Sequence, residues 1–194
     1  MNSTVLNRVK ITLNHEIVLP KTLIKVLSIL VFITLTTFGA YVRIPLPFTP
    51  VPITLQTLFV MLSGIYLGAN LAGISQLSYI MLGYLGVPLF AGASSGLSVL
   101  TGPTGGYLIG FVLCGYIIGR LVKLRDNFSW IVFSISIGAL IILLLGTIWL
   151  GLLMRLSFKK AFMVGFAPFI LGDTLKVLVA SYFYKTFRYK IKGF

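Results

Sequence analysis

Apolar runs long enough to cross a lipid bilayer follow one another along most of this chain. An α-helix rises about 1.5 Å per residue, so about 20 apolar residues cross the ~30 Å hydrocarbon layer. Of the 194 residues, 58% are hydrophobic and only 10% are charged. Too little polar surface remains to coat a soluble globule of this size. The sequence therefore predicts an integral membrane protein and excludes a soluble enzyme, a disordered chain and a disulfide scaffold.

Six transmembrane helices account for these runs, which makes the predicted fold all-α. Two of the runs are short and are separated only by Gly68, which indicates a hairpin of two short or tilted helices, or one bent element. The last run is interrupted by Pro168 and Gly172 and carries two charged residues. The predicted helices are 23–42, 53–67, 69–82, 107–122, 130–153 and 162–183.

Polar and basic segments lie at both ends of the apolar region. They divide the chain into an N-terminal tail (1–22), a single transmembrane domain (23–184) and a basic C-terminal tail (185–194). With both tails in the cytoplasm, eleven of the 16 Lys and Arg residues lie inside and four lie outside. Cytoplasmic loops carry the excess of Lys and Arg in membrane proteins, so this orientation is the prediction. The net charge of +13 is accordingly attributed to membrane anchoring rather than to nucleic-acid binding.

Two unusual loops would then face the outside together. Four prolines between positions 45 and 52 exclude a helix and predict an extended connector. Residues 83–106, here called the glycine loop, contain seven glycines and two prolines among apolar residues. Irregular backbone at membrane depth is tolerated where it is buried in protein or lines a cavity. The glycine loop is therefore the first candidate for a partly buried lid over a binding site.

Most residues that enzymes and pumps require are missing from the sequence. It contains no Gly-x-x-x-x-Gly-Lys-Ser/Thr phosphate loop, so the chain has no visible means of using ATP itself. The sequence contains one histidine and one cysteine. These are too few for a nucleophile–base arrangement, an intrachain disulfide or a metal cluster. We predict no enzymatic activity, no catalytic residue, no metal site and no cofactor. A single intramembrane acid also argues against cation-coupled transport, which usually places several ionisable groups along its path.

That acid, Asp173, lies three residues before Lys176, so both occupy one helix face. The pair is either an internal ion pair that locks helix packing or part of a ligand site, where the carboxylate accepts N–H groups and the ammonium donates to a carbonyl or carboxylate. Gln56 lies early in the second helix, where its amide either joins two helices or binds a ligand. Tyr79 and Tyr107 each offer an apolar ring with a polar tip, for packing or for a pocket.

Four segments together resemble one family, and they follow one another in that family's order between residues 23 and 183. The segments are Pro-Phe-Thr-Pro-Val-Pro-Ile-Thr-Leu-Gln-Thr (47–57), Leu-Gly-Tyr-Leu-Gly-Val-Pro-Leu-Phe-Ala-Gly (82–92), Gly-Pro-Thr-Gly-Gly-Tyr-Leu-Ile-Gly-Phe (102–111) and Gly-Asp-Thr-Leu-Lys (172–176). With these segments the chain resembles the biotin-specific substrate-binding (S) component of energy-coupling-factor (ECF) transporters, the BioY family.

The resemblance implies a six-helix, multi-pass protein of a prokaryotic cytoplasmic membrane that captures biotin from outside. It implies association with a transmembrane coupling subunit and two cytoplasmic ATPase subunits, which would explain the missing phosphate loop. The family's alanine-based docking motif on the first helix is matched only by Thr36-x-x-x-Ala40. The substrate-binding residues carried over by motif are Asp173, Lys176, Gln56, Tyr79, Phe90, Gly92 and Tyr107.

Two other classes of function are compatible with the composition. One is a self-sufficient secondary transporter or facilitator of a small vitamin-like solute. The other is a structural membrane protein that binds nothing small.

Overall fold

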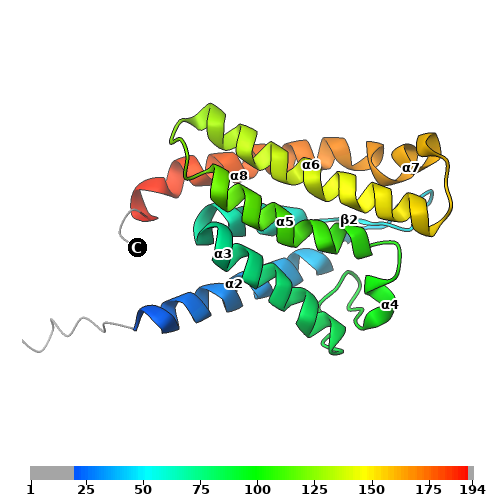
Figure 1. Ribbon diagram of the computed structural model, residues 1–194, viewed down its shortest axis with the longest axis horizontal. Helices are drawn as coiled ribbons and strands as arrows, with labels where there is room; N and C mark the ends of the chain where they lie inside the picture. Colours follow the sequence, from blue (N-terminus) through cyan, green and yellow to red (C-terminus); the bar gives the residue numbers. More distant parts are fainter. Residues whose placement is uncertain (1–19, 192–194) are drawn as a thin grey trace, which may run out of the picture.

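The computed structural model of this chain describes residues 20–191, with side chains through residue 186 (Figure 1). The predicted N-terminal tail therefore lies almost entirely outside the described residues. The helices are α2 (Lys21–Tyr41), α3 (Gln56–Tyr84), α4 (Leu97–Leu100), α5 (Gly105–Leu121), α6 (Phe128–Leu153), α7 (Phe158–Gly165), the 3₁₀ turn η1 (Ala167–Phe169) and α8 (Ile170–Ile191). The strands are β1 (Arg43–Ile44) and β2 (Ile53–Thr54).

The backbone of α3 breaks at Gly68, as the sequence predicts. Its φ of 72° and ψ of 175° are accessible to glycine but not to residues with a Cβ. The break divides α3 into two arms, and helices overlap all six predicted segments. By length and composition, the segments able to cross a membrane are Lys21–Tyr41, Gln56–Tyr84, Phe128–Leu153 and Phe158–Thr186, with Gly105–Leu121 as a shorter apolar helix.

Three of the predicted helix boundaries are wrong, one of them at the end of the last helix, which runs to Ile191 rather than to position 183. The second helix begins at Gln56 rather than at position 53, because Ile53–Thr54 pairs with β1 in an antiparallel ladder that sets Arg43 opposite Thr54. The proline segment between the two strands is non-helical, as expected. The last segment begins earlier than predicted, as α7, and is broken near Pro168, which cannot donate a helical hydrogen bond.

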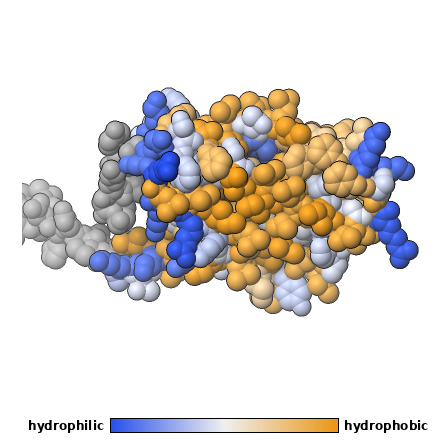
Figure 2. All heavy atoms as spheres, turned by 45° about the horizontal axis from the view of Figure 1, so that its top comes forward, coloured by the Kyte–Doolittle hydropathy of each residue, from blue (hydrophilic) through white to orange (hydrophobic). Residues whose placement is uncertain are grey.

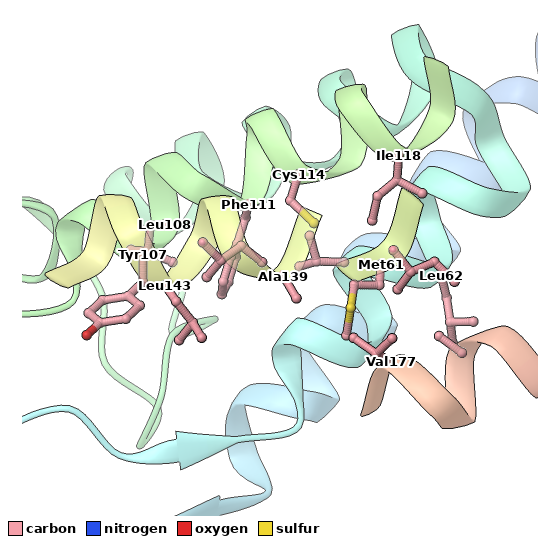
Figure 3. Close-up of a cluster of buried hydrophobic side chains, with 14 of the residues drawn as sticks. Met61, Leu62, Tyr107, Leu108, Phe111, Cys114, Ile118, Ala139, Leu143 and Val177 are labelled. Atoms are coloured by element: carbon pink, nitrogen blue, oxygen red, sulfur yellow. The ribbon is translucent and has the colours of Figure 1, made fainter. Parts of the chain in front are cut away.

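Helix α5 packs between α3 and α6, while α2 packs on α3, and α8 packs on both α3 and α6. One side of α5, from Tyr107 to Ile118, forms a row of buried side chains (Figure 3). Glycines allow the close approach of α5 to α3: a Cβ on Gly119 would collide with the backbone of Gly68 and Ala69. Gly119 therefore serves packing within this chain.

The surface is apolar along the middle and hydrophilic at both ends (Figure 2). Large apolar side chains such as Leu171 and Leu152 are about three-quarters exposed, at 75% and 74%. Exposure of this kind is expected where lipid replaces water as the solvent. Both ends of the described chain lie at one end of the bundle, and α4, α7 and the proline segment lie at the other (Figure 1).

Candidate binding site

A cavity of about 320 Å³ lies where the β1–β2 hairpin, the glycine loop and helices α3, α5, α6 and α8 meet. Its volume is at the lower end of the ~300–1,000 Å³ range of small-molecule sites. Much of its wall is apolar, from Val51, Leu108, Phe111, Ile142, Leu143 and Phe169. The polar side chains on the wall are Arg43, Thr54, Gln56, Thr57, Ser94, Ser98, Thr104, Tyr107, Asp173 and Lys176. A mostly apolar pocket with a few convergent polar groups is the usual form of a small-molecule site.

The predicted pair on α8 forms an ion pair on the cavity wall. Lys176 Nζ lies 2.8 Å from Asp173 Oδ1, and the two side chains are only 12% and 6% exposed. Thr57, on α3, joins them: its hydroxyl accepts a hydrogen bond from Lys176 Nζ at 2.8 Å and donates to Asp173 Oδ1 at 3.0 Å. Within the described part of the chain, every hydrogen bond to this carboxylate ends at Oδ1. Oδ2 therefore has capacity to accept a donor from a ligand.

Gln56 also lies on the cavity wall, at the first residue of α3, and is 5% exposed. Its amide is held from two directions. Its Oε1 accepts from the Thr54 hydroxyl at 3.1 Å, and its Nε2 donates to the Tyr79 hydroxyl at 2.6 Å. These two partners determine where the oxygen and the nitrogen of the amide lie.

Arg43 is the cation that sequence analysis did not select. It is one of the four Lys and Arg residues predicted to lie outside, and β1 places it on the cavity wall beside Thr54 of β2. Its guanidinium fills the space beside Gly92, where a Cβ would collide with it. The one sequence signal for Arg43 was its position directly before the proline segment. That segment leads the chain back toward the cavity at the start of α3. With Arg43, Lys176 and Asp173, the charged groups on the wall sum to +1, which favours an anionic ligand.

The seven predicted site residues divide into two groups. Gln56, Tyr107, Asp173 and Lys176 line the cavity. The Tyr107 hydroxyl also donates to the Gly165 carbonyl at 2.6 Å, which ties α5 to the end of α7.

The other three, Tyr79, Phe90 and Gly92, are not among the lining residues. Tyr79 and Phe90 lie behind Gln56 and are 0% and 1% exposed, while Gly92 makes room for Arg43. Sequence analysis missed Arg43, Thr57 and the apolar wall. Thr57 directly follows Gln56 in the segment 47–57 that carries the family resemblance. That position was the one sequence signal that could have placed it in the site.

Known proteins resemble this chain over most of its length. The family model described as the BioY family matches residues 9–193. The biotin transporter BioY of Thermotoga maritima is 41% identical over 151 residues, covering 78% of this chain and 88% of that protein. A probable biotin transporter BioY of Pyrococcus horikoshii is also 41% identical, covering 77% of this chain and 86% of its own length.

The fold also matches that of a solved structure. The crystal structure described as the S-component for biotin from an ECF-type ABC transporter superposes with a TM-score of 0.81. The match covers 87% of this chain and 92% of the other, at 23% identity. At that identity the likeness concerns the fold, which is that of a multi-pass, all-α membrane protein.

Proposed function

The chain belongs to the BioY family, and from this premise we propose that it is the biotin-binding membrane subunit of an ECF-type uptake transporter. The observation that carries the proposal is the buried cluster of Thr57, Asp173 and Lys176 on the wall of a largely apolar cavity. A buried ion pair that faces a cavity in a membrane protein marks a functional site by default. The ligand is the cargo, and the family is one of transporters rather than enzymes.

The chemistry of biotin suits this cavity. The ureido ring offers two N–H donors and one carbonyl, the fused sulfur ring is apolar, and the side chain ends in a carboxylate. In our proposal Asp173 accepts a ureido N–H through Oδ2, and Lys176 donates to the ureido carbonyl or to the carboxylate. The apolar wall around Phe111, Ile142 and Leu143 covers the sulfur ring.

Arg43 is the second candidate for the biotin carboxylate. A guanidinium pairs with a carboxylate through two parallel hydrogen bonds, which gives orientation as well as affinity. In this assignment Arg43 holds the tail and leaves Lys176 to the ureido carbonyl.

Binding of biotin by the purified chain tests the proposal. We expect saturable binding by the parent, and at least tenfold weaker binding by Asp173→Asn and by Lys176→Ala, because each change leaves a buried charge without its partner. Matched controls are Asp126→Asn and Lys159→Ala, which alter exposed residues outside the cavity and should bind as the parent does. Parent-like affinity in both cavity variants would exclude this cavity as the site.

We further propose that both tails lie in the cytoplasm, so that the cavity opens outward. The uneven distribution of Lys and Arg supports this orientation. An impermeant maleimide applied to whole cells should react with Ser157→Cys, next to α7, and not with Leu124→Cys, in the α5–α6 turn. The native Cys114 is buried and should give no background. The reverse labelling pattern would overturn the orientation.

A further inference from the structure

The hydroxyl of Tyr79 joins the cavity to the glycine loop. It accepts a hydrogen bond from Gln56 Nε2 at 2.6 Å and donates one to the Leu89 carbonyl at 3.0 Å. The hydroxyl therefore donates one hydrogen bond and accepts another at the same time. The side chain of Tyr79 is fully buried. Removing that oxygen would leave a buried amide and a loop carbonyl each without this partner.

The ring of Tyr79 holds the same part of the loop. Phe90 packs edge-to-face on it, with ring centroids 5.5 Å apart. Phe90 is itself 1% exposed and occupies the space above Gly83, where a Cβ would collide with its ring. Leu89 and Phe90 are thus docked on α3 by a hydrogen bond and by packing together.

Both ends of this connection reach the cavity wall. Gln56 lies on the wall directly, and the loop returns to it through Ala91 and Ser94, immediately after the docked residues. Thr54, which fixes the other end of the Gln56 amide, also lines the cavity. A ligand that contacts Gln56 therefore contacts a side chain that is hydrogen-bonded to Tyr79, and Tyr79 holds the loop.

We propose that Tyr79 is a positioning residue rather than a ligand contact: it links the orientation of the Gln56 amide to the docking of the glycine loop over the cavity. The inference rests on the proposed function for the identity of the ligand, biotin. When the loop is docked, it slows the escape of the ligand. Loss of the Tyr79 hydroxyl therefore acts chiefly on the dissociation rate.

The dissociation rate of biotin from Tyr79→Phe tests this inference. The variant keeps the ring and its packing against Phe90 but removes both hydrogen bonds. We expect dissociation about fivefold faster, the factor that corresponds to one hydrogen bond of average strength. Tyr66→Phe is the matched control, because it removes a half-buried hydroxyl from the same helix away from the cavity, and it should dissociate as the parent does.

A double-mutant comparison separates positioning from general stability. If Tyr79 links Gln56 to the loop, then adding Tyr79→Phe to Gln56→Met should weaken binding by a smaller factor than adding it to the parent, because the part of its effect that passes through Gln56 is already lost. A spin label at Ser95→Cys reports on the loop, with Cys114 too buried to react. Biotin should immobilise this label in the parent and not in Tyr79→Phe.

The outcomes are separable from those that test the function. A parent that binds no biotin would overturn the proposed function. If the parent binds biotin and Tyr79→Phe matches the parent in dissociation rate and label mobility, only this inference is overturned. That holds even if the variant melts at a lower temperature. If Tyr79→Phe does not fold, the spin label at position 95 is measured in Gln56→Met at saturating biotin. A label as immobile as in the parent would overturn the link between Gln56 and the loop.

Discussion

Thr57 is the residue that connects the charged pair on α8 to α3. Its hydroxyl donates to Asp173 and accepts from Lys176, so it fixes two charged side chains from a different helix. Hydrogen bonds to charged groups contribute about 1.5–3 kcal/mol, more than those between neutral groups. Thr57 therefore fixes the orientation of the Asp173 carboxylate and of the Lys176 ammonium on the cavity wall.

Replacing Thr57 with valine should weaken biotin binding about tenfold, because the shape is kept while both hydrogen bonds are lost. Isothermal titration of the purified variant measures the change. The control is Thr34→Val, which removes an exposed hydroxyl bonded only to the Leu30 carbonyl of its own helix. Unchanged affinity would mean that the Asp173–Lys176 pair holds its geometry without help from α3.

Arg43 should decide whether the protein prefers an anionic ligand. Because the biotin amide lacks the carboxylate charge, we expect the parent to bind biotin at least tenfold more tightly than the amide, and Arg43→Ala to lose that preference. Competition binding with both ligands measures it, and Lys160→Ala, an exposed cation away from the cavity, should keep the preference. An equal loss for both ligands would indicate that Arg43 instead supports the loop, since its guanidinium lies against Gly92.

At the scale of elements, the break in α3 sets how the cavity is built. Gly68 turns the second arm so that Tyr79 meets Gln56, 23 residues earlier in the chain. No residue with a Cβ adopts its dihedral angles without strain of about 1–3 kcal/mol. The position of the glycine is visible in the sequence, but the direction of the second arm is not.

Gly68→Ala should therefore lower the free energy of unfolding by about 1–3 kcal/mol. Gly73→Ala is the matched control on the same helix: its dihedral angles are helical and a Cβ there would touch only the Tyr116 side chain at 3.8 Å. That change should be neutral or stabilising by about 0.5–1 kcal/mol. Unfolding of both variants in detergent compares them, and equal stability would show that the break tolerates other residues.

The helices were more predictable from sequence than the site, for a physical reason. Bilayer thickness fixes the length of an apolar run, so segments such as α2 and α6 are visible without any tertiary contact. The pairing of Arg43 with Thr54 is a contact between separate strands, and two residues carry no periodic pattern that reveals it. The same holds for Tyr79, which motif resemblance placed in the site and which lies one layer behind the cavity wall.

On the scale of the whole molecule, the two ends of the bundle differ in the elements and charges that they carry. The hairpin, the glycine loop and α7 gather at the end where the cavity lies (Figure 1). The opposite end collects the basic α5–α6 turn and the end of α8, joined by a hydrogen bond from the Tyr184 hydroxyl to Asp126 at 3.3 Å. In the proposed function, ligand binding therefore lies at the end of the bundle opposite to this basic end.

This division bears on the source of energy for transport. The sequence holds no phosphate loop, and within residues 20–191 a single carboxylate lines the cavity. A carrier that couples uptake to a proton or sodium gradient needs a group that binds the cation along with the substrate. Asp173, the one acid among the described residues that line the wall, is already paired with Lys176 and held by Thr57.

Liposomes that contain this chain alone should therefore bind biotin without accumulating it. We expect the interior concentration of labelled biotin to stay at or below the exterior one under an imposed proton or sodium gradient. Addition of a coupling subunit and ATPases should give ATP-dependent accumulation, which Asp173→Asn should reduce at low biotin because fewer binding sites are filled. Asp126→Asn is again the matched control. Gradient-driven accumulation by the chain alone would contradict the role of a subunit and favour a self-sufficient transporter, because the energy would then have to enter through this cavity.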